Sequence, residues 1–287
     1  MAKVIKVLSL DGGGVRGLFQ LKLLALLEQE LKTPLWKIFD IVIGTSSGAI
    51  LAATVALGLD LNKTLASFEK HSKDIFNRRY AWLSFFRPKH SISGLKRFLQ
   101  ELFDAGQLSN VRNRLIIPLV DEHNRIELWE SKAQEIGLSK VLLGATLAPI
   151  YFDIDFFIGE KRYLDGGIVV NNPSFLLVNK FMQNKLPLKD IKMISLGSGE
   201  YPDHKKYVRY SGYKDIARLI DTFYFSQVNL VDDLVKSHLS PEQYLRINPI
   251  LDEIYLDNAK RSYLNYLENN AVHYYREHRT AILEFIK

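Results

Sequence analysis

The feature that most constrains the fold is an uncharged stretch, residues 41–59, with a cluster of small residues near its start. A short apolar segment, Ile41-Val42-Ile43, runs into Gly44-Thr45-Ser46-Ser47-Gly48, and an apolar, alanine-rich segment follows. This Gly-x-Ser-x-Gly pattern is typical of a nucleophile elbow, in which a strand turns sharply into a helix and exposes the serine hydroxyl. The sequence therefore predicts Ser46 as a nucleophile beside a helix N-terminus, whose field favours negative charge.

Two simpler interpretations compete with the elbow. The motif is short enough to arise by chance, and Ser46 is then an inert serine in a glycine-rich turn. The uncharged run is also close to the length that spans a bilayer. However, the helix-poor residues 44–48 interrupt the run, and Asp40 and Asp60 flank it. We therefore expect a buried strand, a turn and a buried helix rather than a membrane span.

The composition is that of a globular protein. A chain of 287 residues, with 47% hydrophobic and 24% charged residues, is long enough for one large domain with a substantial core. The absence of cysteine excludes disulfides, thiol catalysis and cysteine-ligated metals. The first ten residues are typical of a strand rather than a signal peptide, so we expect a cytoplasmic protein without a transmembrane helix.

The net charge of +6 is compatible with a peripheral contact to anionic membrane surfaces. The basic residues are spread along the chain, and neither zinc-finger spacing nor an RNA-binding aromatic signature is present. We therefore expect no nucleic acid as a partner.

A second glycine-rich segment, Asp11-Gly12-Gly13-Gly14-Val15-Arg16-Gly17, joins a predicted strand at residues 4–10 to an apolar helical pattern. Its successive glycines leave backbone N–H groups uncovered beside a helix N-terminus, which suits an anion. The spacing also fits a dinucleotide fingerprint, but that fold needs an acidic residue at the end of its second strand. Here the second strand ends in glycine and threonine, so we expect the amides to face an oxyanion.

The rest of the chain alternates buried-strand and helical patterns, which predicts an α/β domain. Further strands are expected at 114–121, 125–129, 154–158, 161–164, 191–196 and 244–248, and helices at 47–57, 61–76, 93–103, 174–183, 213–239 and from 258 onward. After about residue 202 the glycine-rich strand ends stop. We predict one domain over residues 1–205 and a mainly helical part, residues 206–287, packed on it.

Residues 77–89 mix arginine and lysine with tyrosine, tryptophan and phenylalanine. This composition suits a membrane–water interface, where aromatic rings embed and cations meet head groups. An ordinary loop whose aromatic rings pack inward is the alternative, because aromatic residues usually lie in the core.

Several blocks in a fixed order carry a family resemblance. They are residues 11–17, 44–48 and 145–152, Asp165-Gly166-Gly167 with Asn171-Asn172-Pro173, and residues 195–199. With these blocks the sequence resembles the patatin-like phospholipases, which are serine lipid acyl hydrolases. The resemblance covers roughly the first 200 residues. It implies a three-layer α/β fold with a mostly parallel central sheet flanked by helices and a helical C-terminal part.

The resemblance also implies the roles of particular residues. Ser46 is expected as the nucleophile and Asp165 as its base, while the N–H groups of Gly12, Gly13 and Gly14 are expected to form the oxyanion hole. The supporting residues are expected to be Asp11, Arg16, Gly17, Gly44, Gly48, Gly166 and Gly167. A carboxylate is a weak base at its usual pKa, but burial beside apolar groups raises that pKa and makes it a usable base.

Other serine chemistry stays open at this point. A Ser-His-Asp hydrolase or an acyltransferase also uses a serine elbow, with a histidine base. The chain has seven histidines, none of which lies at a glycine-rich strand end: His71, His90, His123, His204, His238, His273 and His278.

The most direct interpretation is a phospholipase A type of lipid acyl hydrolase that acts on membrane glycerophospholipids through an acyl-enzyme. We expect no metal, because neither a His-Glu-x-x-His motif nor a calcium loop is present, and no cofactor. Two alternatives remain: a phospholipase that needs an activating ligand or partner, which the sequence does not identify, and a non-catalytic binding module of the same fold.

Overall fold

The computed structural model describes residues 4–77, 88–104, 106–131, 136–152, 155–202 and 216–287. Its centre is one sheet with the strand order β5-β6-β3-β2-β1-β7-β8, and β4 pairs with β3 outside this order. The strands are β1 (Ile5–Leu10), β2 (Ile41–Gly44), β3 (Arg114–Asp121), β4 (Ile126–Glu130), β5 (Phe157–Ile158), β6 (Lys161–Asp165), β7 (Ile191–Leu196) and β8 (Tyr244–Ile247).

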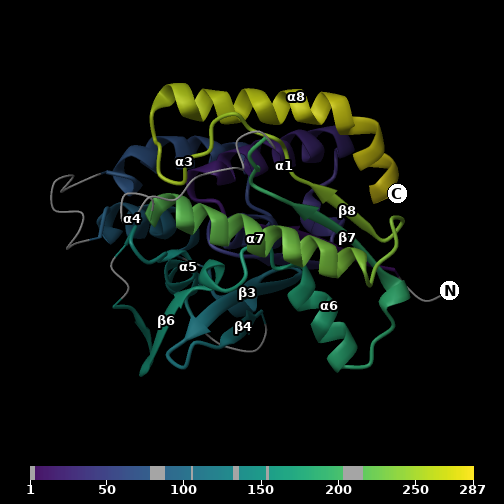
Figure 1. Cartoon of the computed structure of the whole chain (residues 1–287), viewed down its shortest axis with the longest axis horizontal. Helices are drawn as coiled ribbons and strands as arrows, with labels where there is room; N and C mark the ends of the chain where they lie inside the picture. Colours follow the sequence, from purple (N-terminus) through teal and green to yellow (C-terminus); the bar gives the residue numbers. More distant parts are fainter. Residues whose placement is uncertain (1–3, 78–87, 105, 132–135, 153–154, 203–215) are drawn as a thin grey trace.

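Helices cover both faces of the sheet (Figure 1). They are α1 (Gly17–Leu31), α2 (Ser47–Leu57), α3 (Leu61–Ile75), α4 (Ile92–Phe103), α5 (Leu138–Thr146), α6 (Ser174–Gln183), α7 (Ile216–Lys236) and α8 (Arg261–Ile286). The predicted strands and helices are found with small shifts at their ends. The aromatic and basic segment within 77–89 falls almost wholly on residues 78–87, outside the described residues.

Neighbours β3, β2, β1, β7 and β8 run parallel, whereas β4, β5 and β6 add antiparallel pairs. The parallel strands are short, buried and rich in valine, isoleucine and leucine, as expected where helices cover both faces of a sheet. This arrangement confirms the expected three-layer α/β fold with a mostly parallel sheet.

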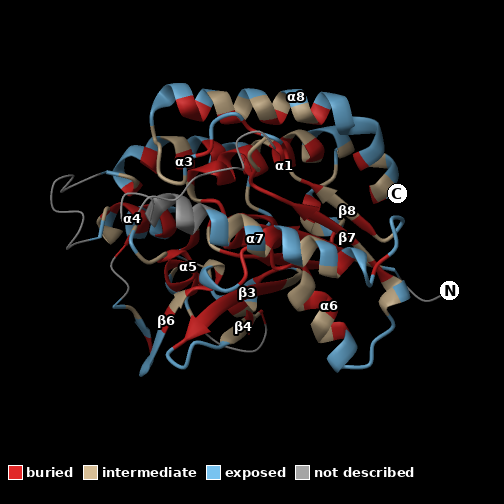
Figure 2. Ribbon diagram, viewed as in Figure 1, coloured by how far each residue is buried: buried red, intermediate tan, exposed pale blue. Residues whose placement is uncertain are grey.

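Alternate residues of each strand point to opposite layers. Leu8 and Val42 belong to a large apolar cluster with α1–α5 and α8, whereas Val7, Ile41 and Ile43 belong to a second cluster with α6 and α7. This period-two alternation is the ordinary geometry of a strand. It places two cores on the two sides of one sheet, and Figure 2 shows the strands β3 and β7 as mostly buried.

The C-terminal part shares this sheet. Strand β8 pairs in parallel with β7, from Met193–Tyr244 to Leu196–Ile247. Helix α8 lies against α1, where the rings of Phe19 and Tyr274 meet edge-on with their centroids 6.0 Å apart. The predicted boundary at residue 205 falls within 203–215, outside the described residues. None of the helices in the described part of the chain has both the length and the hydropathy that crossing a membrane requires.

A buried ion pair joins the C-terminal part to the glycine-rich loop. The guanidinium of Arg246, on β8, donates to both carboxylate oxygens of Asp11, at 3.0 and 2.6 Å, and to Ser195 Oγ at 2.8 Å. Burial raises the pKa of Asp11, while the charge and hydrogen bonds of Arg246 oppose this rise. Burial lowers the pKa of Arg246, but Asp11 outweighs this effect and raises it, and the two side chains form a bidentate pair beneath the loop.

Replacing Arg246 with methionine should destabilise the protein by about 3–5 kcal/mol, because it leaves a buried carboxylate without its partner. Urea unfolding measures this change, and Asp11→Asn added to Arg246→Met should recover part of it. The control is Arg97→Met, which breaks the exposed Arg97–Asp74 pair and should cost less than about 1 kcal/mol. Equal costs for the two variants would contradict the structural role of Arg246.

Candidate active site

Ser46 lies at the sharp turn between β2 and α2. Its backbone adopts φ 53° and ψ −127°, a conformation that costs energy for any residue with a side chain. The turn is fixed by Thr45 N, which donates to Leu10 O at 3.1 Å, and by Ala49 N, which donates to Ser46 O at 2.9 Å. The structure therefore has the strand–turn–helix geometry that the Gly-x-Ser-x-Gly pattern predicts.

The two glycines of the elbow stand where backbones meet. A Cβ atom on Gly44 would lie 2.2 Å from Gly48 O, and one on Gly48 would lie 2.4 Å from Leu10 O. Any larger residue would therefore push α2 away from β1 and β2, and with it the backbone that holds Ser46 in its strained conformation.

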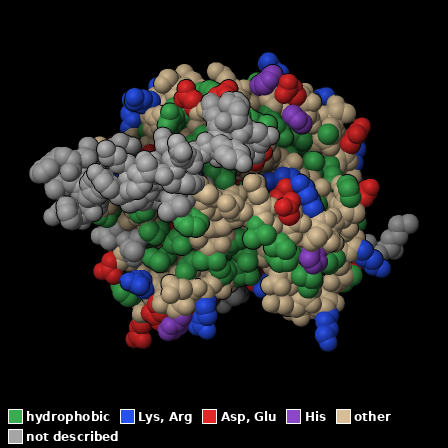
Figure 3. All heavy atoms as spheres, in the orientation of Figure 1, with side chains coloured by type: hydrophobic (Ala, Val, Ile, Leu, Met, Phe, Trp, Pro, Cys, Tyr) green, Lys and Arg blue, Asp and Glu red, His purple; other side chains and the backbone are tan. Residues whose placement is uncertain are grey.

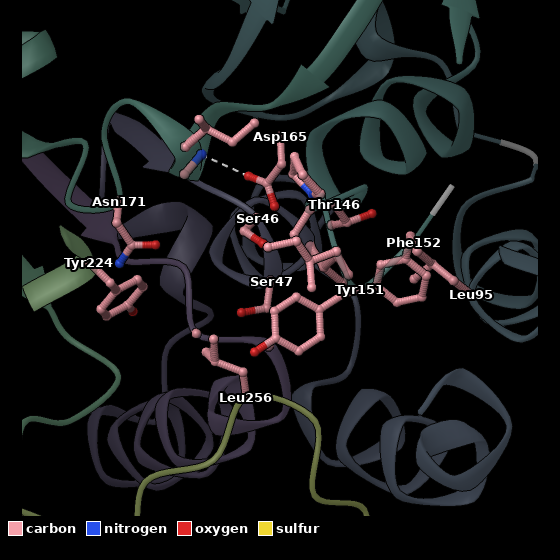
Figure 4. A pocket seen from close by; sticks show the side chains of 18 of the residues that line it. Ser46, Ser47, Leu95, Thr146, Tyr151, Phe152, Asp165, Asn171, Tyr224 and Leu256 are labelled. Atoms are coloured by element: carbon pink, nitrogen blue, oxygen red, sulfur yellow. Dashed lines mark hydrogen bonds between the residues drawn. The ribbon is translucent and has the colours of Figure 1, made fainter. Parts of the chain in front are cut away.

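Asp165 ends β6 and faces Ser46 across the site (Figure 4). Burial raises its pKa to about 6, while hydrogen bonds from the Ser46 side chain and the Gly167 N–H act in the opposite direction. The Gly167 N–H donates to Asp165 Oδ1 at 2.8 Å, which fixes the carboxylate. Gly166 allows this turn to lie against β3, because a Cβ there would come within 2.4 Å of Pro118 O.

The glycine-rich loop passes beside Ser46, and its three amides have different surroundings. The N–H of Gly12 donates to the backbone oxygen of Asn171 at 3.1 Å, so this amide is already occupied. Gly13 and Gly14 line the cavity that contains Ser46, and the structure gives their amides no hydrogen-bond partner among the residues it describes. Of the three predicted donors, the geometry therefore favours Gly13 and Gly14 and disfavours Gly12.

The remaining predicted residues support the loop from behind. Arg16 is buried, and its Nε donates to Gly13 O at 3.3 Å while its NH1 donates to Gly199 O at 3.1 Å. Gly17 begins α1 close to the Ser47 side chain.

The sequence analysis missed four side chains that hydrogen-bond to the glycine-rich loop: Asn171, Ser198, Tyr224 and Arg246. Asn171 and Ser198 lie in blocks that carried the resemblance, so a signal for them was present. Tyr224 and Arg246 lie in α7 and β8, where no motif marks them.

A cavity of about 410 Å³ opens beside Ser46 and runs between α2, α3 and α4. Away from the serine its walls are apolar. They include Ile50, Phe68, Ile75, Leu95, Phe98 and Phe152. Figure 4 shows Leu95 and Phe152 on one side of Ser46, and Asn171 and Tyr224 on the other. A cavity of this size and lining suits a hydrocarbon chain held with its carbonyl carbon at Ser46.

The histidine alternative finds no support in this cavity, because no histidine is among the described residues that line it. The ring of His90 lies beside Tyr151 and Phe152, which line the cavity. Its Nε2, however, lies 3.0 Å from the Asp257 carboxylate.

The patatin-like phospholipase family model matches residues 8–178, more than half of the chain. The chain therefore belongs to the patatin-like phospholipase family, which confirms the resemblance and assigns the chain to serine-type lipid ester hydrolases.

Among curated relatives, the chain is 28% identical over 291 residues to a cGAMP-activated phospholipase of Escherichia coli (strain TW11681), covering 91% of this chain and 79% of the relative. It is also 28% identical to a cUMP-AMP-activated phospholipase of Escherichia coli, over 70% of this chain and 67% of that relative. It is also 26% identical to human calcium-independent phospholipase A2-gamma, covering 94% of this chain but 38% of that protein. Among solved structures, VipD from Legionella pneumophila aligns with a TM-score of 0.50 and 12% identity, over 96% of this chain and 67% of that chain, which shows a shared fold.

The raised pKa of Asp165 predicts the pH dependence of ester hydrolysis. A carboxyl group acts as a base only when ionised, so kcat/KM should fall as the pH drops below about 6, with half of the maximum near pH 6 and a tenfold loss for each further pH unit. Hydrolysis of a soluble p-nitrophenyl ester, followed as a function of pH, measures this fall in kcat/KM. A midpoint near pH 7 that disappears in a histidine variant would contradict Asp165 as the base.

Proposed function

We propose that the protein hydrolyses fatty acyl esters of membrane glycerophospholipids with Ser46 as nucleophile and Asp165 as general base. The observation that carries the proposal is the meeting of Ser46 and Asp165 with the amides of Gly13 and Gly14, which have no hydrogen-bond partner within the described part of the chain, beside an apolar cavity. Membership in the patatin-like phospholipase family supports the reaction class.

The reaction follows from this geometry. Asp165 takes the proton of Ser46 as the serine oxygen attacks the ester carbonyl, and the amides of Gly13 and Gly14 stabilise the resulting oxyanion. Collapse of this intermediate expels the alcohol, which takes the proton from Asp165, and leaves the acyl group on Ser46. Water, deprotonated by Asp165, then attacks the acyl-enzyme. As this second intermediate collapses, the Ser46 oxygen leaves with the proton from Asp165, and the fatty acid is released.

Ser46→Ala and Asp165→Asn should each lower phospholipid turnover by roughly 10⁴-fold while the fold is retained, because each removes one member of the reacting pair. Fatty acid release from phosphatidylcholine vesicles measures the loss, and a fluorophosphonate probe should label the wild type at Ser46 but not Ser46→Ala. Asp190→Asn, far from the cavity, is the control and should keep full activity. Substantial turnover by Ser46→Ala would refute the proposal.

The cavity mouth carries exposed apolar side chains. Ile150, Ile168 and Phe223 line the cavity and are 50%, 41% and 60% exposed. Figure 3 shows apolar side chains gathered on this face between α5 and α7. Ile150 also has φ 73°, an unusual conformation for a β-branched residue. We propose that this rim, defined as Ile150, Ile168 and Phe223, enters the membrane surface and lets an acyl chain pass into the cavity.

Phe223→Ser should weaken vesicle binding and vesicle hydrolysis by about tenfold. The reason is that transfer of a phenylalanine side chain from water into an apolar environment is favourable by about 1.5–3 kcal/mol. Hydrolysis of a soluble short-chain ester should change less than twofold. Leu186→Ser, on an apolar residue that is 44% exposed outside the cavity lining, is the control for both assays. Equal losses on vesicles and on the soluble ester would contradict a membrane-binding rim.

A second candidate is a phospholipase that stays weakly active until a ligand binds. Its support is the names of bacterial relatives that are activated by cGAMP or cUMP-AMP. Under this proposal, one of these two compounds should raise vesicle hydrolysis by at least about tenfold, the range of common allosteric couplings. Full activity of the purified protein without any additive would rule the candidate out.

A further inference from the structure

The carbonyl oxygen of Gly12 lies behind the glycine-rich loop and collects an unusual number of donors. Ser198 Oγ donates to it at 2.8 Å, Asn171 Nδ2 donates at 3.2 Å, and the hydroxyl of Tyr224 donates as well. The hydroxyls of Ser198 and Tyr224 also lie 3.0 Å apart, so the three side chains form one hydrogen-bond network around this oxygen. One backbone oxygen is thus fixed by side chains from three separate parts of the chain.

Fixing this oxygen also fixes an amide on the other side of the loop. The peptide between Gly12 and Gly13 is planar and trans, so its C=O and its N–H point in opposite directions. The donors hold the carbonyl toward α7 and the end of β7, and the Gly13 N–H is therefore directed away from them. Gly13 is also one of the two glycines of the loop that line the cavity with Ser46.

A run of glycines needs such support. Glycine has no Cβ and rotates easily about its backbone bonds, so a peptide between two glycines can turn over. A turned peptide would put the Gly12 carbonyl oxygen where negative charge develops on the substrate. An oxyanion hole works because its donors are already aligned before the reaction.

Tyr224 is itself held firmly. Its ring lies against the guanidinium of Arg16, 5.0 Å from the ring centroid, and edge-on to Phe225 at 5.1 Å. Burial raises the pKa of the Tyr224 hydroxyl, so the group keeps its proton and remains a donor. Arg16 also donates to the next carbonyl, that of Gly13, so the two side chains support one another and successive peptides of the loop.

We propose that Tyr224, on α7, is a positioning residue that holds the Gly12 carbonyl back and thereby aims the Gly13 N–H at the oxyanion. Ser198 and Asn171 share this task. The inference rests on the proposed hydrolase function and extends it to a helix beyond the matched residues 8–178. Tyr224 also lines the cavity, but its hydroxyl donates to the Gly12 carbonyl, and we propose that it acts through the loop.

The kinetic test is Tyr224→Phe, assayed with a soluble p-nitrophenyl ester. We expect kcat to fall about tenfold, the size of one lost hydrogen bond, with KM changed less than twofold. Adding Ser198→Ala should bring the loss toward the roughly 100-fold of a missing oxyanion donor. Tyr244→Phe is the control, because Tyr244 is a buried tyrosine of the other apolar cluster and its hydroxyl donates to Asp232 at 2.8 Å.

A transition-state mimic separates positioning from a general loss of structure. A trifluoromethyl ketone adds to the serine and forms an oxyanion, so its inhibition constant should rise by the same factor as kcat/KM falls across the variants. Unchanged kcat in Tyr224→Phe, a change in KM alone, or undiminished ketone affinity would overturn the inference.

An NMR measurement tests the contact without any turnover. With glycine labelled at both the carbonyl carbon and the amide nitrogen, an HNCO spectrum reports only amides that follow another glycine, which are Gly13, Gly14 and Gly167. Loss of the hydrogen bond should move the Gly12 carbonyl carbon upfield in Tyr224→Phe and leave it in place in Tyr244→Phe. An unmoved carbonyl signal overturns the inference, whereas a wild-type protein that is inactive both with and without cGAMP or cUMP-AMP overturns the proposed function instead.

Discussion

The site depends on how the carbonyl oxygens of the glycine-rich loop are anchored. The oxygen of Asp11 accepts from Gln20, that of Gly12 from three side chains, and that of Gly13 from Arg16. Because every peptide is planar, holding these oxygens on one side directs the amides to the other. A run of glycines is thus held in one conformation, with the Gly13 and Gly14 backbone lining the cavity beside Ser46.

Two buried carboxylates in this region serve different ends because their surroundings differ. Asp11 has a guanidinium against both of its oxygens and ties β8 to the loop. Asp165 has no cation among the groups that shift its pKa, only the hydroxyl of Ser46 and one amide. Burial therefore raises the pKa of Asp165 into the range where it can both take and return a proton, which suits a general base.

Much of the fold was predictable because its signals are local. The buried strands, the elbow around Ser46 and the glycine-rich loop each show in a few consecutive residues, and the structure has them where the sequence analysis expected them. The exception within the loop is Gly12, whose amide is taken by Asn171. That contact joins residues far apart in the chain, so no local pattern could show it.

By itself, the sequence determined the residue types that chemistry needs and the short segments that present them: a serine in a tight turn, an aspartate before two glycines, and a glycine triplet before a helix. The tertiary structure decided which groups meet. It placed Tyr224, 212 residues from Gly12, and Arg246, 235 residues from Asp11, behind the loop. It also decided which amides stay open and how far burial raises the pKa of Asp165. The reason is physical: propensity and spacing act over a few residues, whereas desolvation and hydrogen-bond geometry depend on every segment that packs around a site.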